Sequence, residues 1–131
     1  MKEAVTLDIR SYKDLKVWQK AIILVENIYD VTKSFPKEEI YGLTSQIRRC
    51  AVSVPSNIAE GSSKRSTKEF IRFINMSYGS LSELETQLYI ALRLKFINDM
   101  TNSAFESQIA ELGRMLNGLR LGLTKKLNSE L

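Results

Sequence analysis

Basic side chains gather in one part of this sequence, between residues 44 and 75. This stretch carries six basic residues against Glu60 and Glu69, whereas positive and negative charges cancel in residues 1–43 and 76–131. The basic residues are Arg48, Arg49, Lys64, Arg65, Lys68 and Arg72. The loop that carries Lys64 and Arg65 joins the two helical groups, so we expect all six to share one end or edge of the bundle. Guanidinium and ammonium groups neutralise phosphates and release counterions, so the cluster predicts salt-sensitive binding to RNA or DNA backbones. A solvated face without a partner is the alternative interpretation.

Residues that usually carry metal or nucleophilic catalysis are scarce. The chain has no histidine, whereas di-iron bundles need paired Glu-x-x-His motifs. Its one cysteine, Cys50, lies beside Ala51 on an apolar stripe, which favours an inert core thiol that has no histidine base. Glu83 and Glu85 are two positions apart and would point away from each other on a helix. We therefore expect no enzyme, no metal site and no cofactor.

Length and composition indicate a single helical domain with no membrane partner. A chain of 131 residues with 44% hydrophobic and 26% charged residues has an ordinary globular composition. No run approaches the ~18 apolar residues that a membrane span needs, and a single cysteine fits a reducing cytoplasm. We expect residues 1–12 to form an N-terminal arm and residues 13–131 to form the bundle. The alternation of Val5, Leu7 and Ile9 allows an extended arm, and a flexible, frayed tail is the other interpretation.

Hydrophobic periodicity predicts four amphipathic helices. The first begins at Asp14 and ends before Pro36, which excludes the preceding residue from the helical region. Its apolar stripe is Leu15, Trp18, Ile22, Val25 and Tyr29. After a short helical turn at Pro36, the second helix runs from about Leu43 to Gly61, the expected left-handed C′ residue. Its stripe is Leu43, Ile47, Cys50, Val54 and Ile58, and Pro55 predicts a kink.

The third and fourth helices carry the clearest apolar repeats. Ser66 and Glu69 form a capping box, and the third helix should reach about Phe96. Its heptad stripe is Phe70, Ile74, Ser77, Leu81, Leu84, Leu88 and Ala91. A second capping box, Ser103 to Glu106, predicts the start of the fourth helix. Its stripe is Phe105, Ile109, Leu112, Leu116, Leu119 and Leu123. Short links then predict an all-α, antiparallel up-down-up-down four-helix bundle. The excess length of the third helix should protrude from it or support a partner.

Small and polar residues form a second pattern on the faces that remain after the core is assigned. The candidate subunit-interface residues are Ser53, Asn57, Glu60, Ser77 and Ser80. The first three continue a polar stripe opposite the core stripe of the second helix, and the serines of the third helix permit close approach. Solvated surface is the alternative interpretation. Arg48 and Arg49 could also face a neighbouring subunit, which would shrink the exposed basic patch.

Several motifs resemble one known family over nearly the entire chain, about residues 12–127. They are DLKVWQKA (14–21), FPKEE (35–39), YGLTSQIRR (41–49), PSNIAEG (55–61) and GSLSELE (79–85). Together they are similar to the 23S rRNA-intervening-sequence proteins, also called the four-helix bundle protein family. The resemblance implies a bundle that assembles into a ring, usually a pentamer.

A related branch of that family indicates possible partners. It comprises the accessory variability proteins of diversity-generating retroelements, which are basic pentamers that associate with a reverse transcriptase and RNA. The resemblance therefore implies a homopentamer whose partners are RNA or DNA, and a reverse transcriptase or another protein. Two functional hypotheses follow. The first is a non-enzymatic oligomer that binds nucleic acid through the basic cluster, and the second is an assembly scaffold or adaptor with no nucleic-acid role.

Overall fold

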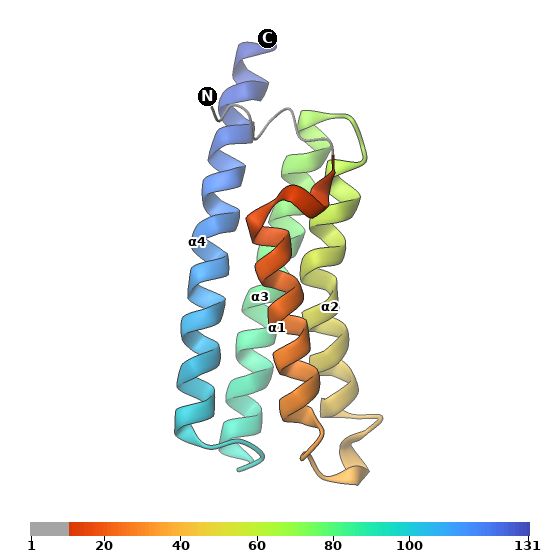
Figure 1. Ribbon diagram of the computed structural model, residues 1–131, viewed down its shortest axis with the longest axis vertical. Coiled ribbons are helices and arrows are strands. Elements are labelled where there is room, and N and C mark those ends of the chain that lie inside the picture. The colour runs from red at the N-terminus through yellow and green to blue at the C-terminus, as the bar shows by residue number, and fades with distance from the viewer. Residues whose placement is uncertain (1–10) are drawn as a thin grey trace.

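The computed structural model describes residues 11–131, which are helical and contain no β-strand (Figure 1). The α-helices in this range are α1 (Lys16–Thr32), α2 (Leu43–Ser62), α3 (Thr67–Arg93) and α4 (Asp99–Ser129). Two 3-10 turns precede α1 and α2, η2 (Tyr12–Asp14) and η3 (Lys37–Glu39). The prediction of an all-helical chain with four helices is therefore confirmed for the described part. The alternating residues Val5, Leu7 and Ile9 of the expected arm lie outside it.

The four helices lie side by side, and Figure 1 shows successive helices joined at alternate ends of the molecule. The α1–α2 and α3–α4 links share one end. The α2–α3 link lies at the other, beside the C-terminal turns of α4, where the Thr67 hydroxyl donates to Glu130 over 3.2 Å. We call this second end the α2–α3 end. Within residues 11–131, no helix has the length and apolar character that crossing a membrane requires.

Two rows of apolar residues run along α1, and the structure buries the row that was not predicted. The buried row is Val17, Ala21, Leu24 and Ile28. In the predicted row Leu15 is buried, but Tyr29 is 41% exposed and Trp18 is only partly buried. Trp18 packs edge-on against Tyr12, with ring centroids 5.3 Å apart. Large aromatic rings that carry a polar group often lie at the boundary of a core. The size of Trp18 and Tyr29 therefore led to the wrong prediction of which row is buried.

α2 buries the predicted residues Ile47, Cys50, Val54 and Ile58. A short turn, η3, precedes it as predicted, and the helix continues through Pro55. The prediction for Gly61 is wrong: this residue lies inside α2, it is buried, and its φ is not positive. A Cβ atom at Gly61 would lie 2.7 Å from the Cβ of Phe73. The glycine therefore permits close approach of α2 and α3 rather than a left-handed turn.

α3 begins where the capping box predicts, and α4 begins earlier than expected. The Ser66 hydroxyl accepts a hydrogen bond from the Glu69 N–H over 3.2 Å, while the Glu69 carboxylate pairs with Arg72. The start of α4 at Asp99 contradicts the predicted box at Ser103. The Asn98 side chain caps α4 instead by accepting from the N–H of Thr101 at 2.8 Å.

Most residues of the predicted stripes of α3 and α4 are buried in the core. The buried members are Ile74, Ser77, Leu81, Leu84, Leu88, Ala91, Phe105, Ile109, Leu112, Leu116 and Leu123. α4 has 31 residues and α3 has 27, so α4 is about 46 Å long and α3 about 40 Å. The expectation that the third helix protrudes is therefore wrong. The C-terminal turns of α4 extend beyond the other helices (Figure 1).

Candidate nucleic-acid interface

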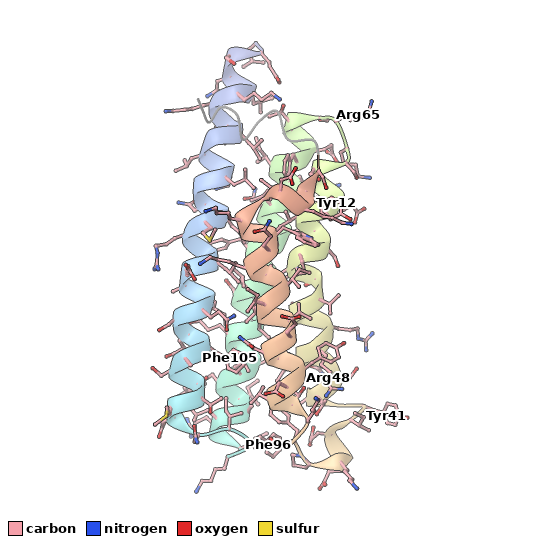
Figure 2. The ribbon with its side chains drawn as sticks, in the orientation of Figure 1. Tyr12, Tyr41, Arg48, Arg65, Phe96 and Phe105 are labelled. Atoms are coloured by element: carbon pink, nitrogen blue, oxygen red, sulfur yellow. The ribbon has the colours of Figure 1, made fainter. Side chains whose placement is uncertain are left out.

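The six cations that the sequence groups together lie at two opposite ends of the bundle. Figure 2 shows Arg48 near the α1–α2 link and Arg65 at the α2–α3 end. Fourteen residues of α2 separate Arg48 from Ser62 at the end of that helix, which corresponds to about 21 Å along the helix axis. The expectation that all six share one end or edge is therefore wrong. Fourteen helical positions thus cover about half the length of α3, which has 27 residues.

Arg48 connects α1 to α2. Its Nε donates to the Thr32 hydroxyl over 2.8 Å, and its guanidinium lies 4.7 Å from the centre of the Tyr29 ring. These contacts turn the half-buried side chain onto α1 and away from an external phosphate. Arg49 is exposed and reaches Ser45 of its own helix at 3.5 Å. Arg48 and Arg49 therefore do not belong to one patch with the other four cations.

Lys64 and Arg72 lie at the α2–α3 end but are partly engaged by neighbouring groups. Arg72 pairs with Glu69 at 3.0 Å, and its guanidinium lies 4.6 Å from the centre of the Phe73 ring. The hydrogen bond from Arg72 lowers the pKa of the exposed Glu69 carboxyl, because it stabilises the charged form. Lys64 lies 3.9 Å from Glu60. Among residues 11–131, no ion pair involves Arg65 or Lys68.

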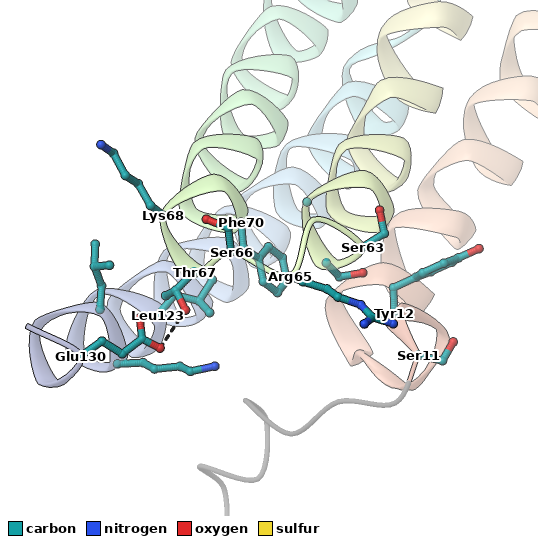
Figure 3. A pocket seen from close by; sticks show the side chains of 14 residues that line it. Ser11, Tyr12, Ser63, Arg65, Ser66, Thr67, Lys68, Phe70, Leu123 and Glu130 are labelled. Carbon is teal, nitrogen blue, oxygen red and sulfur yellow. Dashed lines mark hydrogen bonds between the residues drawn. The ribbon is translucent and has the colours of Figure 1, made fainter.

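A hollow of about 840 Å³ opens at the α2–α3 end (Figure 3). The α2–α3 link and the first turn of α3 form one side, the C-terminal turns of α4 another, and the residues before α1 a third. Arg65, Lys68 and Lys126 line it together with hydroxyl groups from Ser63 and Thr67. The Ser63 hydroxyl donates to the Glu60 carbonyl, and the Thr67 hydroxyl donates to the Glu130 carboxylate, which also lines the hollow. The three cations outnumber this one carboxylate, so the lining keeps a positive charge that can attract phosphate groups.

Lys125 and Lys126 join this end although the sequence analysis did not select them. Positive and negative charges cancel in residues 76–131. A net charge counted over each segment therefore gives no sign of Lys125 and Lys126. The antiparallel path of α4 returns its last turns to the α2–α3 link, and Lys126 lines the hollow. The signal that would have found them is the predicted topology, because it places the end of the fourth helix beside the start of the third.

The backbone of Arg65 is held in the left-handed region, with φ of 56°. Within the described residues, the other non-glycine residue with positive φ is Lys95, at 66°, in the α3–α4 link at the opposite end. In that link the N–H of Phe96 donates to the carbonyl of Ala91 at 2.8 Å, a Schellman closure of α3. Glycine is the usual residue at such positions. Arg65 therefore has a strained backbone beside the hollow, and Lys95 has the same kind of backbone at the opposite end of the bundle.

The five candidate interface residues occupy different environments. Ser77 is fully buried and its hydroxyl donates to the carbonyl of Val54 over 2.9 Å, so it fastens α3 to α2 and faces no neighbour. Ser53 and Ser80 bond each other at 2.7 Å across the same two helices and remain partly exposed. Asn57 is also partly exposed, and Glu60 is exposed. Ser77 is thus excluded from a subunit interface, whereas the other four remain candidates.

Catalytic groups do not gather in the described structure. Burial, together with the smaller effect of nearby Glu83, raises the pKa of the Cys50 thiol to about 12. The thiol is therefore protonated at neutral pH, and it donates to the Ser80 carbonyl at 3.1 Å. Within residues 11–131, no group of three or more histidine, cysteine, aspartate or glutamate side chains could hold a metal ion.

Comparisons with known proteins agree with this architecture. The chain is similar to the crystal structure of a protein with unknown function from the S23 ribosomal protein family, from Bacteroides thetaiotaomicron. The TM-score is 0.74 at 22% identity, over 79% of this chain and 94% of that chain, which supports the helical fold. No curated protein matches the sequence. The family model described as 23S rRNA-intervening sequence protein matches residues 13–118, and the chain therefore belongs to that family.

Proposed function

We propose that this protein is a non-enzymatic, cytoplasmic assembly of up-down-up-down bundles that binds RNA or DNA backbones through its α2–α3 end. The observation that carries the proposal is the gathering of Arg65, Lys68 and Lys126 around one hollow. Arg65 and Lys68 are neighbours along the chain, whereas Lys126 reaches the hollow from the C-terminal turns of α4. Their convergence produces a local positive field that would attract phosphates and make binding sensitive to salt.

A ring of subunits, as the family resemblance implies, would strengthen this binding. One chain carries a net charge of +4, so five copies at +4 each would carry +20. If the α2–α3 ends face the same side, several weak phosphate sites act on one nucleic acid and the effective affinity rises through avidity. The outer faces of α2 and α3 support self-association, because Val52 is 37% exposed, Met76 44% and Ile90 43%. Ser53, Asn57, Glu60 and Ser80 are the interface residues proposed beside them.

An assembly scaffold or protein adaptor is the second candidate function. It is favoured by Tyr41, which is 95% exposed, and by its neighbour Ile40, which is 47% exposed. Both lie in the α1–α2 link, at the end opposite the hollow (Figure 2). Exposed apolar groups of this kind are typical of protein contacts, and a reverse transcriptase or another protein is the partner that the resemblance implies.

The proposal is tested by titrating labelled structured RNA and duplex DNA with the purified protein at about 50 and 200 mM salt. We expect submicromolar binding at low salt and at least a tenfold loss at the higher concentration. Sedimentation of the same samples measures the subunit number. Absence of binding at low salt would overturn the nucleic-acid function and leave the scaffold as the primary interpretation. A monomer at micromolar concentration would argue against the ring.

Replacing Arg65 with glycine should separate binding from stability. The left-handed backbone of Arg65 and of Lys95 is strained for an L residue, so each change to glycine should raise the free energy of unfolding by about 1 kcal/mol. We expect only Arg65→Gly to weaken nucleic-acid binding, because Lys95 lies at the opposite end. Urea unfolding and the titration above provide both readouts. Equal weakening by both variants would contradict the placement of the site.

A further inference from the structure

Two aromatic rings lie beside the cations of the hollow, although no aromatic residue is interleaved with the basic cluster in the sequence. Tyr12, from the turn before α1, and Phe70, from the first turns of α3, both line the hollow and are partly exposed. Figure 3 shows the Arg65 side chain extending toward Tyr12, and Phe70 close to Ser66. The fold therefore builds an aromatic and cationic surface from three separate segments.

These rings differ from the other aromatic ring at this end, Phe73. Phe73 is only 5% exposed, and the cationic groups of Lys64 and Arg72 lie 5.5 and 4.6 Å from its ring centre. Phe73 is therefore buried by contacts within the protein and has little surface left for a ligand. Tyr12 contacts Trp18 through an edge-on arrangement, with the ring planes at 62°. Tyr12 and Phe70, which line the hollow, are thus partly exposed and available for contact with a ligand.

We propose that the hollow binds an unpaired nucleotide, so that the protein prefers single-stranded RNA or DNA to duplex. The inference rests on the proposed nucleic-acid function and specifies its substrate class. An exposed base would pack against Tyr12 and Phe70, while Arg65 and Lys126 contact the flanking phosphates. Such stacking needs a base that has left the double helix. A volume of about 840 Å³ falls within the usual range for sites that enclose small organic groups.

Hydroxyl groups around the rings fit the same ligand. Ser63 and Ser66 line the hollow. The Ser63 hydroxyl donates to the Glu60 carbonyl and can still accept a hydrogen bond, whereas the Ser66 hydroxyl accepts from the Glu69 N–H and can still donate one. A base presents both donors and acceptors on its edge once it is unpaired, whereas a duplex presents mainly phosphates to such a surface. The mixture of aromatic, hydroxyl and cationic groups therefore distinguishes this hollow from a plain phosphate patch.

The test compares a labelled single strand of about twelve nucleotides with a duplex of the same sequence closed by G·C pairs, at one low salt concentration. We expect the single strand to bind more tightly, and Tyr12→Leu to weaken single-strand binding roughly tenfold with little change for the duplex. Leucine retains an apolar contact with Trp18. The matched control is Tyr89→Leu, in the last turns of α3 toward the opposite end, where the side chain is 51% exposed; it should leave both affinities unchanged.

Trp18 supplies a second readout because it is the only tryptophan and contacts Tyr12. Adding the single strand should change its fluorescence, and adding the duplex should not. Circular dichroism melting shows whether Tyr12→Leu remains folded. Equal affinity of single strand and duplex would overturn the inference while leaving the backbone-binding function intact. Equal loss of both ligands in Tyr12→Leu would also overturn it, and no binding of either ligand would overturn the proposed function itself.

Discussion

Replacing Gly61 with leucine is expected to lower the free energy of unfolding by about 3 kcal/mol. A Cβ atom at this position would lie 2.7 Å from the Cβ of Phe73 and 3.0 Å from Cδ1 of Phe70. The first of these atoms is fixed to the backbone of α3, so α2 and α3 would have to separate to admit the side chain. Helix propensity favours leucine over glycine by less than about 1 kcal/mol, so the steric overlap determines the sign.

Gly118 provides the matched control for this change. It lies inside α4, and no neighbouring atom comes within 4 Å of a Cβ built there. We expect Gly118→Leu to raise the free energy of unfolding by roughly 0.5–1 kcal/mol, because only helix propensity acts. The measurement is the urea midpoint with its slope, which should stay constant if the native state keeps its compactness. Stabilisation by both substitutions would show that α2 and α3 pack less closely at Gly61 than the structure indicates.

The sequence is sufficient to predict those elements that local signals define. The heptad repeat of α3 and the Ser66 cap depend on residues three and four apart, and both are confirmed by the structure. α1 is different because apolar residues occupy two adjacent rows, and only contact with the neighbouring helices α2 and α4 decides which row is buried. The role of Gly61 is likewise tertiary. A glycine near the end of a helix commonly closes it, and the opposing Phe73 is not visible in the local pattern.

The candidate site was predictable in part for the same reason. Lys64, Arg65, Lys68 and Arg72 are neighbours along the chain, so their proximity follows from the sequence. Arg48 is separated from them by the rise of α2 and is engaged by Thr32 and Tyr29 of another helix. Lys126 and Tyr12 reach the hollow from opposite ends of the chain. Their contribution depends on how the helices return on one another, which charge counts along the sequence do not represent.

Reversing the charge of Arg65, Lys68 and Lys126 to glutamate should weaken nucleic-acid binding roughly 100-fold at about 50 mM salt. Each substitution removes a possible phosphate contact and adds a repulsive carboxylate to the hollow. The dependence of the logarithm of the binding constant on the logarithm of salt concentration should also become shallower, by roughly 2 to 3 for duplex DNA. All three side chains line the hollow, and none is in the buried core. The fold should therefore persist, which circular dichroism melting can verify.

A second triple variant distinguishes the effect of charge at the hollow from the effect of the chain's net charge. Lys33, Lys37 and Arg93 are exposed and lie at the opposite end of the bundle, so changing all three to glutamate alters the net charge equally. Long-range repulsion alone would then weaken binding to the same extent in both variants, because each would carry the same total charge. We expect a loss of less than about threefold from the control, since exposed charges separated by more than the Debye length, roughly 14 Å at about 50 mM salt, are largely screened. A comparable loss in the two variants would show that the net charge of the chain drives binding and that the hollow is not the site.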